Sequence, residues 1–368
     1  MSRRKVYRPL RVSARPALSL AASGLRAAFP SAGVRYGLLA LLLLLVLLAY
    51  AAGPVTEQLA FRRALHLVNT LLVFGLTYQL SRRHFWVGFL TALLWGVHPL
   101  HVPLVADGPS PALYGPGFYL LTCLSYLHYR ERRTAGRLAA LLALFGLTGL
   151  TDAALALTLP VVWLCIDFLQ GRSVTRYGLL TGKLPFLLLA GLISLIGLET
   201  RLPVLTVHPT AFAFLPDWRW YGAGDFLTYL GGVFLPYPIN RPLPGPALTT
   251  YAGAGLLALL LYTGVLLWAY WRQKRLLTFS LGVSLALVCP ALLLPAPLFP
   301  YYRYLAYVGL LFGLVFMAEQ RTRASLTNRL AWRVATVVFS LICLYLTLET
   351  GRSREPGFLP EAYVPAER

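Results

Sequence analysis

The chain has 368 residues, of which 58% are hydrophobic and only 12% are charged. Soluble domains carry roughly 25% charged residues, so the composition excludes an ordinary soluble protein. The apolar runs approach the ~20 residues that a helix needs to cross a bilayer, and they lack the alternation of barrel strands. The sequence therefore predicts an all-α polytopic membrane protein.

A formal net charge of +20 would suggest a nucleic-acid partner in a soluble protein. Here the basic residues lie in short loops between apolar runs, which is the positive-inside pattern. We therefore expect membrane lipid as a partner and no nucleic acid. The four cysteines all fall within apolar runs, where we interpret them as small buried apolar side chains. They are Cys123, Cys165, Cys289 and Cys343.

In chain order, residues 1–35 are basic and lack acids, which predicts a cytoplasmic tail. Membrane spans are then expected at about 36–52, 64–80, 84–104, 117–128, 138–150, 153–169, 184–198, 252–270, 277–295, 304–318 and 332–348. Only Thr151 and Asp152 join the fifth span to the sixth, so these two spans should form an antiparallel helical hairpin.

The basic loops assign both ends of Phe226–Tyr237 to the outer side, so this segment should be re-entrant or interfacial. Aromatic residues in and around it are typical of a membrane-interface belt. They are Trp218, Trp220, Tyr221, Tyr229 and Tyr237.

The predicted topology has about eleven crossings, with the N-terminus in the cytoplasm and the C-terminus outside. The transmembrane domain would cover 36–348, with outer loops at 53–63, 98–117, 199–250 and 296–303 and an outer tail at 349–368. We expect a bacterial inner membrane as the location.

The stretch from His98 to Gly117 interrupts the apolar runs with two histidines, Asp107 and several prolines and glycines. Such a break should lie outside the lipid or line a protein cavity, because exposed backbone in hydrocarbon costs several kcal/mol per group. The His98–His101 spacing places both rings on one helical face if the helix continues. Zinc would need a third ligand, and none is nearby in sequence, so a metal requirement stays open.

The topology also gathers ionisable and polar residues on the outer face. They are Glu57, His98, His101, Asp107, Asp152, His208, Arg219, Asp225, Asn240, Arg241 and Arg303. Arginine pairs with phosphate oxygens through two parallel hydrogen bonds, and a carboxylate can take a proton from an attacking hydroxyl. This face therefore suits a phosphate-linked substrate.

Four segments together resemble a known family. They are HLVNTLLVFGL from His66, LLWGVHPLHVPLVAD from Leu93, LPVVWLCID from Leu159 and YYRYLAYVGL from Tyr301. In this order they resemble transmembrane O-mannosyltransferase-like proteins of the GT-C class, over about residues 60–318.

The resemblance implies a GT-C helical bundle, an active site on the periplasmic or luminal face and a polyprenyl-phosphate sugar donor, with a glycan or protein acceptor. The matching residues are His66 and Asn69 in one span, His98, Pro99 and His101 after another, and Arg303 with Tyr304. The chain departs from the family in its first outer loop, which carries only Glu57 where the family has an acidic pair.

Two hypotheses follow. In the first, the chain is an inverting glycosyltransferase in which His98, His101, Arg303 and Arg241 bind the donor phosphate and Glu57 or Asp107 is the base. In the second, it is a catalytically inactive GT-C-like protein that binds a lipid-linked glycan or a partner. A transporter is a weaker alternative, because repeat symmetry and charges within the spans are missing.

Overall fold

The computed structural model describes residues 30–51, 56–107, 111–172, 182–193, 226–227, 229–233, 245–293 and 299–352. Side chains at 107, 111–112, 245–252, 291–293 and 299–303 lie outside this description. The helices are α2 (Ala32–Ala49), α3 (Glu57–Leu80), α4 (Phe85–Gly96), α5 (Pro111–Glu131), α6 (Ala135–Thr151), α7 (Ala153–Leu169), α11 (Gly245–Trp271), α12 (Arg275–Leu293), α13 (Phe299–Arg321) and α14 (Leu326–Arg352). Short helical turns are η1 (Pro99–His101), η2 (Pro103–Asp107) and η5 (Thr322–Ala324).

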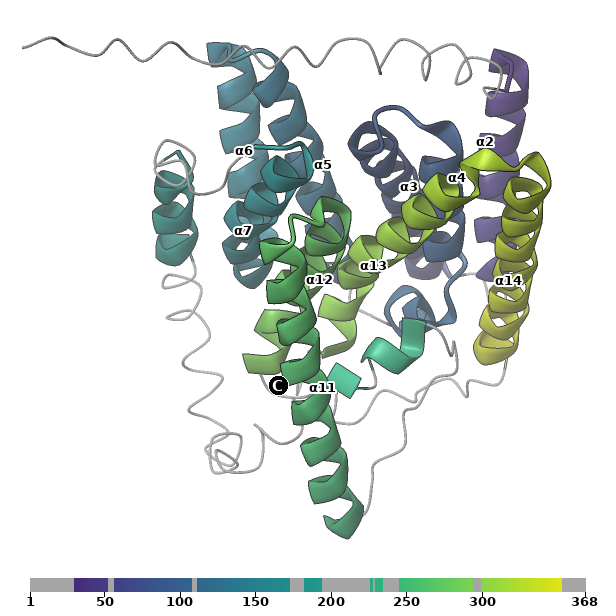
Figure 1. Ribbon diagram of the computed structural model, residues 1–368. Coiled ribbons are helices and arrows are strands. Elements are labelled where there is room, and N and C mark those ends of the chain that lie inside the picture. Colours follow the sequence, from purple (N-terminus) through teal and green to yellow (C-terminus); the bar gives the residue numbers. More distant parts are fainter. Residues whose placement is uncertain are drawn as a thin grey trace, which may run out of the picture. The chain divides into compact units, whose positions relative to one another are not determined.

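The all-α prediction is confirmed, since the described residues contain helices and no strand (Figure 1). Each predicted span falls on a helix, including a short one at Leu184–Ile193. By length and apolar character, however, only α2, α3, Gly253–Trp271 of α11 and α14 qualify as spans among the described helices. A bent pair formed by α4 and Pro99–Ala106 makes five. A membrane protein is therefore supported, and the eleven crossings stay a prediction.

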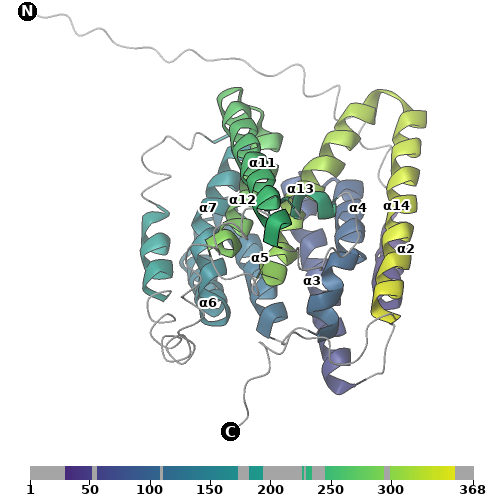
Figure 2. The same ribbon diagram turned by 90° about the horizontal axis from the view of Figure 1, so that it is seen from below.

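The contacts divide the chain into Met1–Leu41 and Leu42–Arg368. In the first unit the described residues form the start of α2, where the Arg35 side chain donates to the Pro30 carbonyl. In the second unit α13 packs against α12 and α4, and α3 packs against α4 and α5. Helices α5, α6 and α7 lie side by side in both ribbon views (Figures 1 and 2).

Helix α3 begins earlier than its predicted start near residue 64. Thr56 caps the helix by accepting a hydrogen bond from the Leu59 amide at 3.2 Å, and Glu57 lies in the first turn, where an acid complements the helix dipole. Most of the predicted loop at 53–63 is therefore helical, from Glu57 onward.

The predicted span at 84–104 is bent rather than straight, because the chain turns by 53° between α4 and Pro99–Ala106. Pro99 and Pro103 each begin a short helical turn, a position at which the backbone N–H has no partner within the helix. Because proline lacks this N–H, neither residue can donate the hydrogen bond that would continue the preceding helix. The described part of the 98–117 segment is thus largely helical rather than an open loop.

The predicted hairpin of the fifth and sixth spans corresponds to α6 and α7, which pack against each other. Asp152 ends α6 and caps α7, where its side chain accepts a hydrogen bond from the Leu155 amide at 3.0 Å. A single capping residue thereby supplies both the stop and the restart of the helical chain.

On the side of the basic loops, a buried ion pair joins α13 to α14. Arg333 donates to both carboxylate oxygens of Glu319, at 2.7 and 3.0 Å, and its guanidinium lies 4.4 Å from the centre of the Trp86 ring. Glu319 is 1% exposed. This bidentate pair is balanced in charge, which is what allows such groups to be buried.

Candidate functional site

A chain of hydrogen bonds joins three of the segments singled out in the sequence. His66 Nε2 lies 2.9 Å from the Gly96 carbonyl, so this nitrogen carries the proton and donates it. His66 Nδ1 is then an acceptor, and the Tyr304 hydroxyl donates to it at 2.7 Å. Asn69 Nδ2 donates to the same hydroxyl at 3.2 Å and to the Leu113 carbonyl at 3.0 Å. His66 and Asn69, three residues apart in α3, therefore both bond the Tyr304 hydroxyl.

Side chains from distant segments bind backbone carbonyls at the break after α4, where the ladder of helical hydrogen bonds is interrupted. His66 binds the Gly96 carbonyl, Thr347 of α14 donates to the Val97 carbonyl at 2.8 Å, and Tyr50 donates to the His98 carbonyl at 3.2 Å. Three separate parts of the chain therefore hold the bend in place.

His101 lies at the centre of a ring of aromatic side chains and is 1% exposed. Its ring centre is 4.8 Å from those of Trp95 and Tyr304 and 5.7 Å from that of His66. Neither of its ring nitrogens makes a hydrogen bond of good geometry with a described residue, although a backbone group of Trp95 lies close by. Because buried polar atoms are nearly always paired, two unpaired nitrogens indicate a place where a ligand or water binds.

His98 presents a second unpaired nitrogen. Its Nδ1 accepts a bond from the Leu100 amide at 3.4 Å, whereas its Nε2 makes no hydrogen bond of good geometry with a described residue, although a backbone group of Val233 lies close by. The ring stacks on Tyr307 at 5.4 Å, and Tyr307 stacks in turn on Tyr229 at 4.8 Å. Because η1 is a 3₁₀ turn, residues three apart share one side, which brings the His98 and His101 ring centres to 5.9 Å.

We call this set of residues the His101 cluster. Its members are His66, Asn69, Trp95, His98, His101, Tyr304 and Tyr307. Trp95 also fixes the backbone of α13, because its indole N–H donates to the Tyr304 carbonyl at 2.8 Å.

Among the described side chains, the structure shows no contact between the other predicted site residues and the His101 cluster. Glu57 is exposed in the first turn of α3, nine residues before His66. Asp107 ends η2, and Arg303 directly precedes Tyr304 in α13, but the side chains of both lie outside the description. Arg241 lies outside the described residues altogether.

The same holds for several outer-face and belt residues. His208, Arg219, Asp225, Asn240, Trp218, Trp220, Tyr221 and Tyr237 are all outside the described residues. Tyr229 is described. It is 0% exposed and packs within the protein, where its hydroxyl bonds to Ser284 and its ring covers Tyr307. Its place at a membrane interface stays a prediction.

Sequence reasoning missed Tyr50, Trp95, Tyr307 and Thr347. Trp95 and Tyr307 could have been found, because they stand three residues from His98 and Tyr304 respectively and so share a helical side with a motif residue. Tyr50 and Thr347 gave no signal, since their role is to satisfy carbonyls of a distant segment.

No group of three or more potential metal ligands occurs among the described His, Cys, Asp and Glu side chains. An apolar cavity of about 30 Å³ lies between Leu76, Tyr119, Phe279 and Phe312, which is room for about two waters and too little for a lipid chain. All four cysteines are free thiols; Cys123 and Cys343 are buried as expected, whereas Cys289 is exposed.

The imidazole nitrogens of His98 and His101 lie in a largely apolar environment at the bend after α4. There they could hydrogen-bond a polar group of a ligand. No protein-family model, no curated protein and no solved structure matches this chain.

Proposed function

We propose that the chain is an integral-membrane glycosyltransferase of GT-C type. It transfers a sugar from a polyprenyl-phosphate donor to an acceptor hydroxyl on the outer face of the membrane. The observation that carries the proposal is the presence of three unpaired imidazole nitrogens, on His98 and His101, buried at the bend after α4.

The assigned topology supports an outer-face site. Four elements bring residues to the bend: the ends of α2, α4 and α14 and the start of α13. In the positive-inside assignment, each of these helix ends is the one away from the basic loops. An odd change in the number of crossings between these helices would put their ends on different sides of the membrane. The positive-inside topology of eleven crossings in a GT-C bundle is therefore part of this proposal.

In the proposed reaction, His98 and His101 hydrogen-bond the phosphate that leaves the sugar and so stabilise its developing charge. Arg303, next to Tyr304 in sequence, adds a positive charge, and Arg241 is the further phosphate-binding residue. One carboxylate, Asp107 or Glu57, takes the proton of the acceptor hydroxyl as it attacks. Such a single displacement inverts the sugar carbon.

A second candidate function is a GT-C-like protein that binds a lipid-linked glycan or partner without turnover. One observation favours it. Glu57 is exposed and about 13 Å along α3 from His66, as nine residues rise in a helix.

The test is transfer by the purified full-length protein in lipid, with radiolabelled polyprenyl-phosphate sugars as donors and membrane extract as the acceptor source. His101→Ala is the test variant, and His128→Ala, an exposed histidine at the end of α5, is the matched control. Loss of transfer of about 100-fold or more in His101→Ala alone is expected, since a lost charge-stabilising donor has effects of this size.

The outcomes separate the candidates. If the wild type binds the donor saturably but transfers no sugar, and His101→Ala weakens that binding, the result favours the binding protein over the enzyme. Neither binding nor transfer across the donor panel overturns both. Transfer that His101→Ala leaves unchanged removes the His101 cluster from the mechanism.

A further inference from the structure

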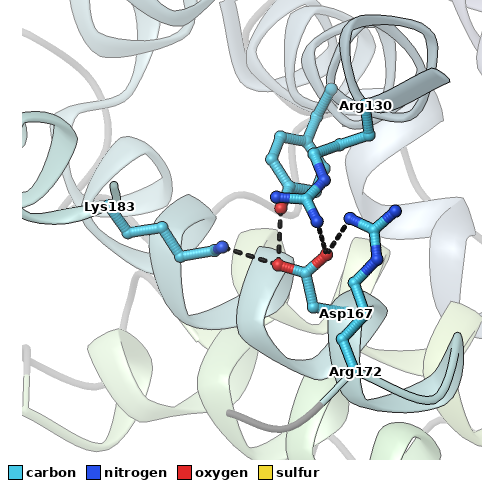
Figure 3. A network of polar contacts seen from close by, with 5 residues as sticks. Arg130, Asp167, Arg172 and Lys183 are labelled. Carbon is cyan, nitrogen blue, oxygen red and sulfur yellow. Dashed lines mark hydrogen bonds and ion pairs between the residues drawn. The ribbon is translucent and has the colours of Figure 1, made fainter. Parts of the chain in front are cut away.

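A second buried polar cluster surrounds Asp167 in the last turn of α7 (Figure 3). Asp167 is 0% exposed. Its Oδ2 accepts hydrogen bonds from Lys183 Nζ at 2.6 Å and from the Tyr126 hydroxyl at 2.7 Å. Its Oδ1 faces Arg172 at 3.3 Å and Arg130 at 3.4 Å. We call these five residues the Asp167 cluster.

Local sequence explains why the chain folds back on this carboxylate. Gly171 has a φ of +87°, and the Arg172 amide bonds the Asp167 carbonyl at 3.0 Å while the Gly171 amide bonds that of Phe168. This is a Schellman ending, which needs the left-handed conformation that glycine adopts easily. It turns Arg172 toward the carboxylate of the helix that it leaves.

The cluster is unbalanced in charge. One carboxylate faces two arginines and one lysine, which gives a formal charge of +2. The side chains of Lys183 and Arg130 are only 5% and 12% exposed, so much of this charge is shielded from water, and Arg172 is more open at 37%. Burial lowers the pKa of Lys183 from its ordinary value, and its bond to Asp167 opposes this shift.

The pair of Glu319 and Arg333 shows how this protein builds a balanced ion pair: one acid, one base and two bonds of 2.7 and 3.0 Å. The Asp167 cluster differs in having spare donors. Both guanidinium contacts to Oδ1 are longer, and the buried Nε of Arg130 has no partner among the described residues. Three cations that share one carboxylate leave buried positive charge unbalanced, which is costly, so an additional anion is the simplest completion.

More positive charge lies beside the Asp167 cluster. A Cβ built on Gly171 would come within 2.5 Å of Arg275 Nη1, which places the Arg275 guanidinium against the turn that carries Arg172. In the positive-inside assignment, the ends of α5 and α7 and the start of α12 are all cytoplasmic, at the height of lipid headgroups.

We propose that the Asp167 cluster binds a phosphate anion, with Arg130 and Arg172 as its principal ligands. Guanidinium groups suit a phosphate because their planar donors bind two of its oxygens at once. The phosphate belongs either to an anionic phospholipid headgroup or to a soluble phosphate. Asp167 is the positioning residue that holds the cations together. This site is separate from the His101 cluster and does not depend on the proposed transferase activity.

The experiment measures the thermal unfolding midpoint of the full-length protein in detergent. One arm adds phosphatidylglycerol and compares it with phosphatidylcholine; the other adds inorganic phosphate and compares it with sodium chloride at equal ionic strength. Titrations give the half-saturating concentration of whichever probe stabilises the protein. Arg130→Gln is the test variant, and Arg132→Gln, an exposed arginine in the same loop, is matched in charge.

We expect one probe to raise the wild-type midpoint by about 2 °C or more at saturation. A response to phosphatidylglycerol alone identifies a lipid headgroup, and a response to inorganic phosphate identifies a soluble ligand. Arg130→Gln should weaken the response about tenfold, and Arg130→Lys should weaken it less, because lysine keeps the charge but loses the planar fork.

Two results overturn the proposal: no response of the wild type to either probe, or equal weakening by Arg132→Gln and Arg130→Gln. Should Arg130→Gln fail to fold, Arg172→Gln takes its place, because Arg172 is the more exposed ligand and its loss disturbs the packing least.

Discussion

The His101 cluster surrounds its polar groups with aromatic rings at the bend after α4, whereas the Asp167 cluster gathers four charged side chains at the end of α7. Both are buried, and both contain atoms without partners, but the unpaired atoms differ. In the first they are imidazole nitrogens, which can donate or accept; in the second the unpaired atom is a guanidinium N–H, which can only donate. The first suits a polar group that must be held during chemistry, and the second suits a permanent anion.

The two clusters also differ in what their members do for the fold. In the His101 cluster, His66 and Tyr304 complete a hydrogen-bonded chain, while His101 makes no hydrogen bond among the described residues. In the Asp167 cluster, every cation depends on one carboxylate. Single substitutions should therefore have graded effects in the first cluster and one dominant effect in the second.

The largest effect is expected for Asp167→Asn, which removes the negative charge from among three cations. The loss should be about 3 kcal/mol of unfolding free energy or more, as when one partner of a buried pair is removed. The measurement is the unfolding midpoint in detergent without added anionic lipid or phosphate. Asp152→Asn, at the other end of α7, is the matched control and should cost at most about 0.5 kcal/mol, because asparagine caps helices as well as aspartate does.

A wild-type-like Asp167→Asn protein would contradict this view of the cluster. It would mean that water or packing, rather than the carboxylate, keeps the three cations in their places.

A smaller and split effect is expected inside the His101 cluster. His66→Leu removes the partners of the Tyr304 hydroxyl and the Gly96 carbonyl, and it should cost about 2 kcal/mol, because buried polar groups are then left unpaired. His101→Leu removes nitrogens that have no partner among the described residues, so it should leave stability within about 0.5 kcal/mol of wild type or raise it. Thermal unfolding of the two variants side by side measures the difference.

Equal destabilisation by the two substitutions would argue that His101 is a structural residue like His66. A stable His101→Leu protein that has lost donor binding or transfer would instead assign His101 to the ligand.

The smallest effect concerns His84, which lies between α3 and α4 near the balanced pair of Glu319 and Arg333. Burial lowers the pKa of His84, with nearby arginines adding to the shift and Glu319 opposing it. The unfolded chain then binds a proton more readily than the folded one, so stability should be complete above about pH 6.5 and fall as the pH drops below it. His84→Gln should flatten the dependence of the unfolding midpoint on pH between 7.5 and 5.5; an unchanged slope would show that other groups cause it.

Most of the helices could be predicted from the sequence, because long apolar runs between basic loops are a local signal. The differences lie where a proline or a cap changes the backbone: α3 starts at Glu57 because Thr56 caps it, and Pro99 and Pro103 bend the third predicted span. His66, Asn69, His98, His101 and Tyr304 were also singled out from the sequence, through segments that resemble a known family.

By itself, then, the sequence determined the class of protein, the position of its helices and the motif residues, since composition and periodicity are properties of neighbours along the chain. Only the tertiary structure decided that Tyr304 bonds His66, that the ring nitrogens of His101 lack well-formed hydrogen bonds to described residues and that Asp167, near the end of a predicted span, collects three cations. These contacts join residues up to 238 positions apart. They depend on how helices pack, which no local pattern encodes.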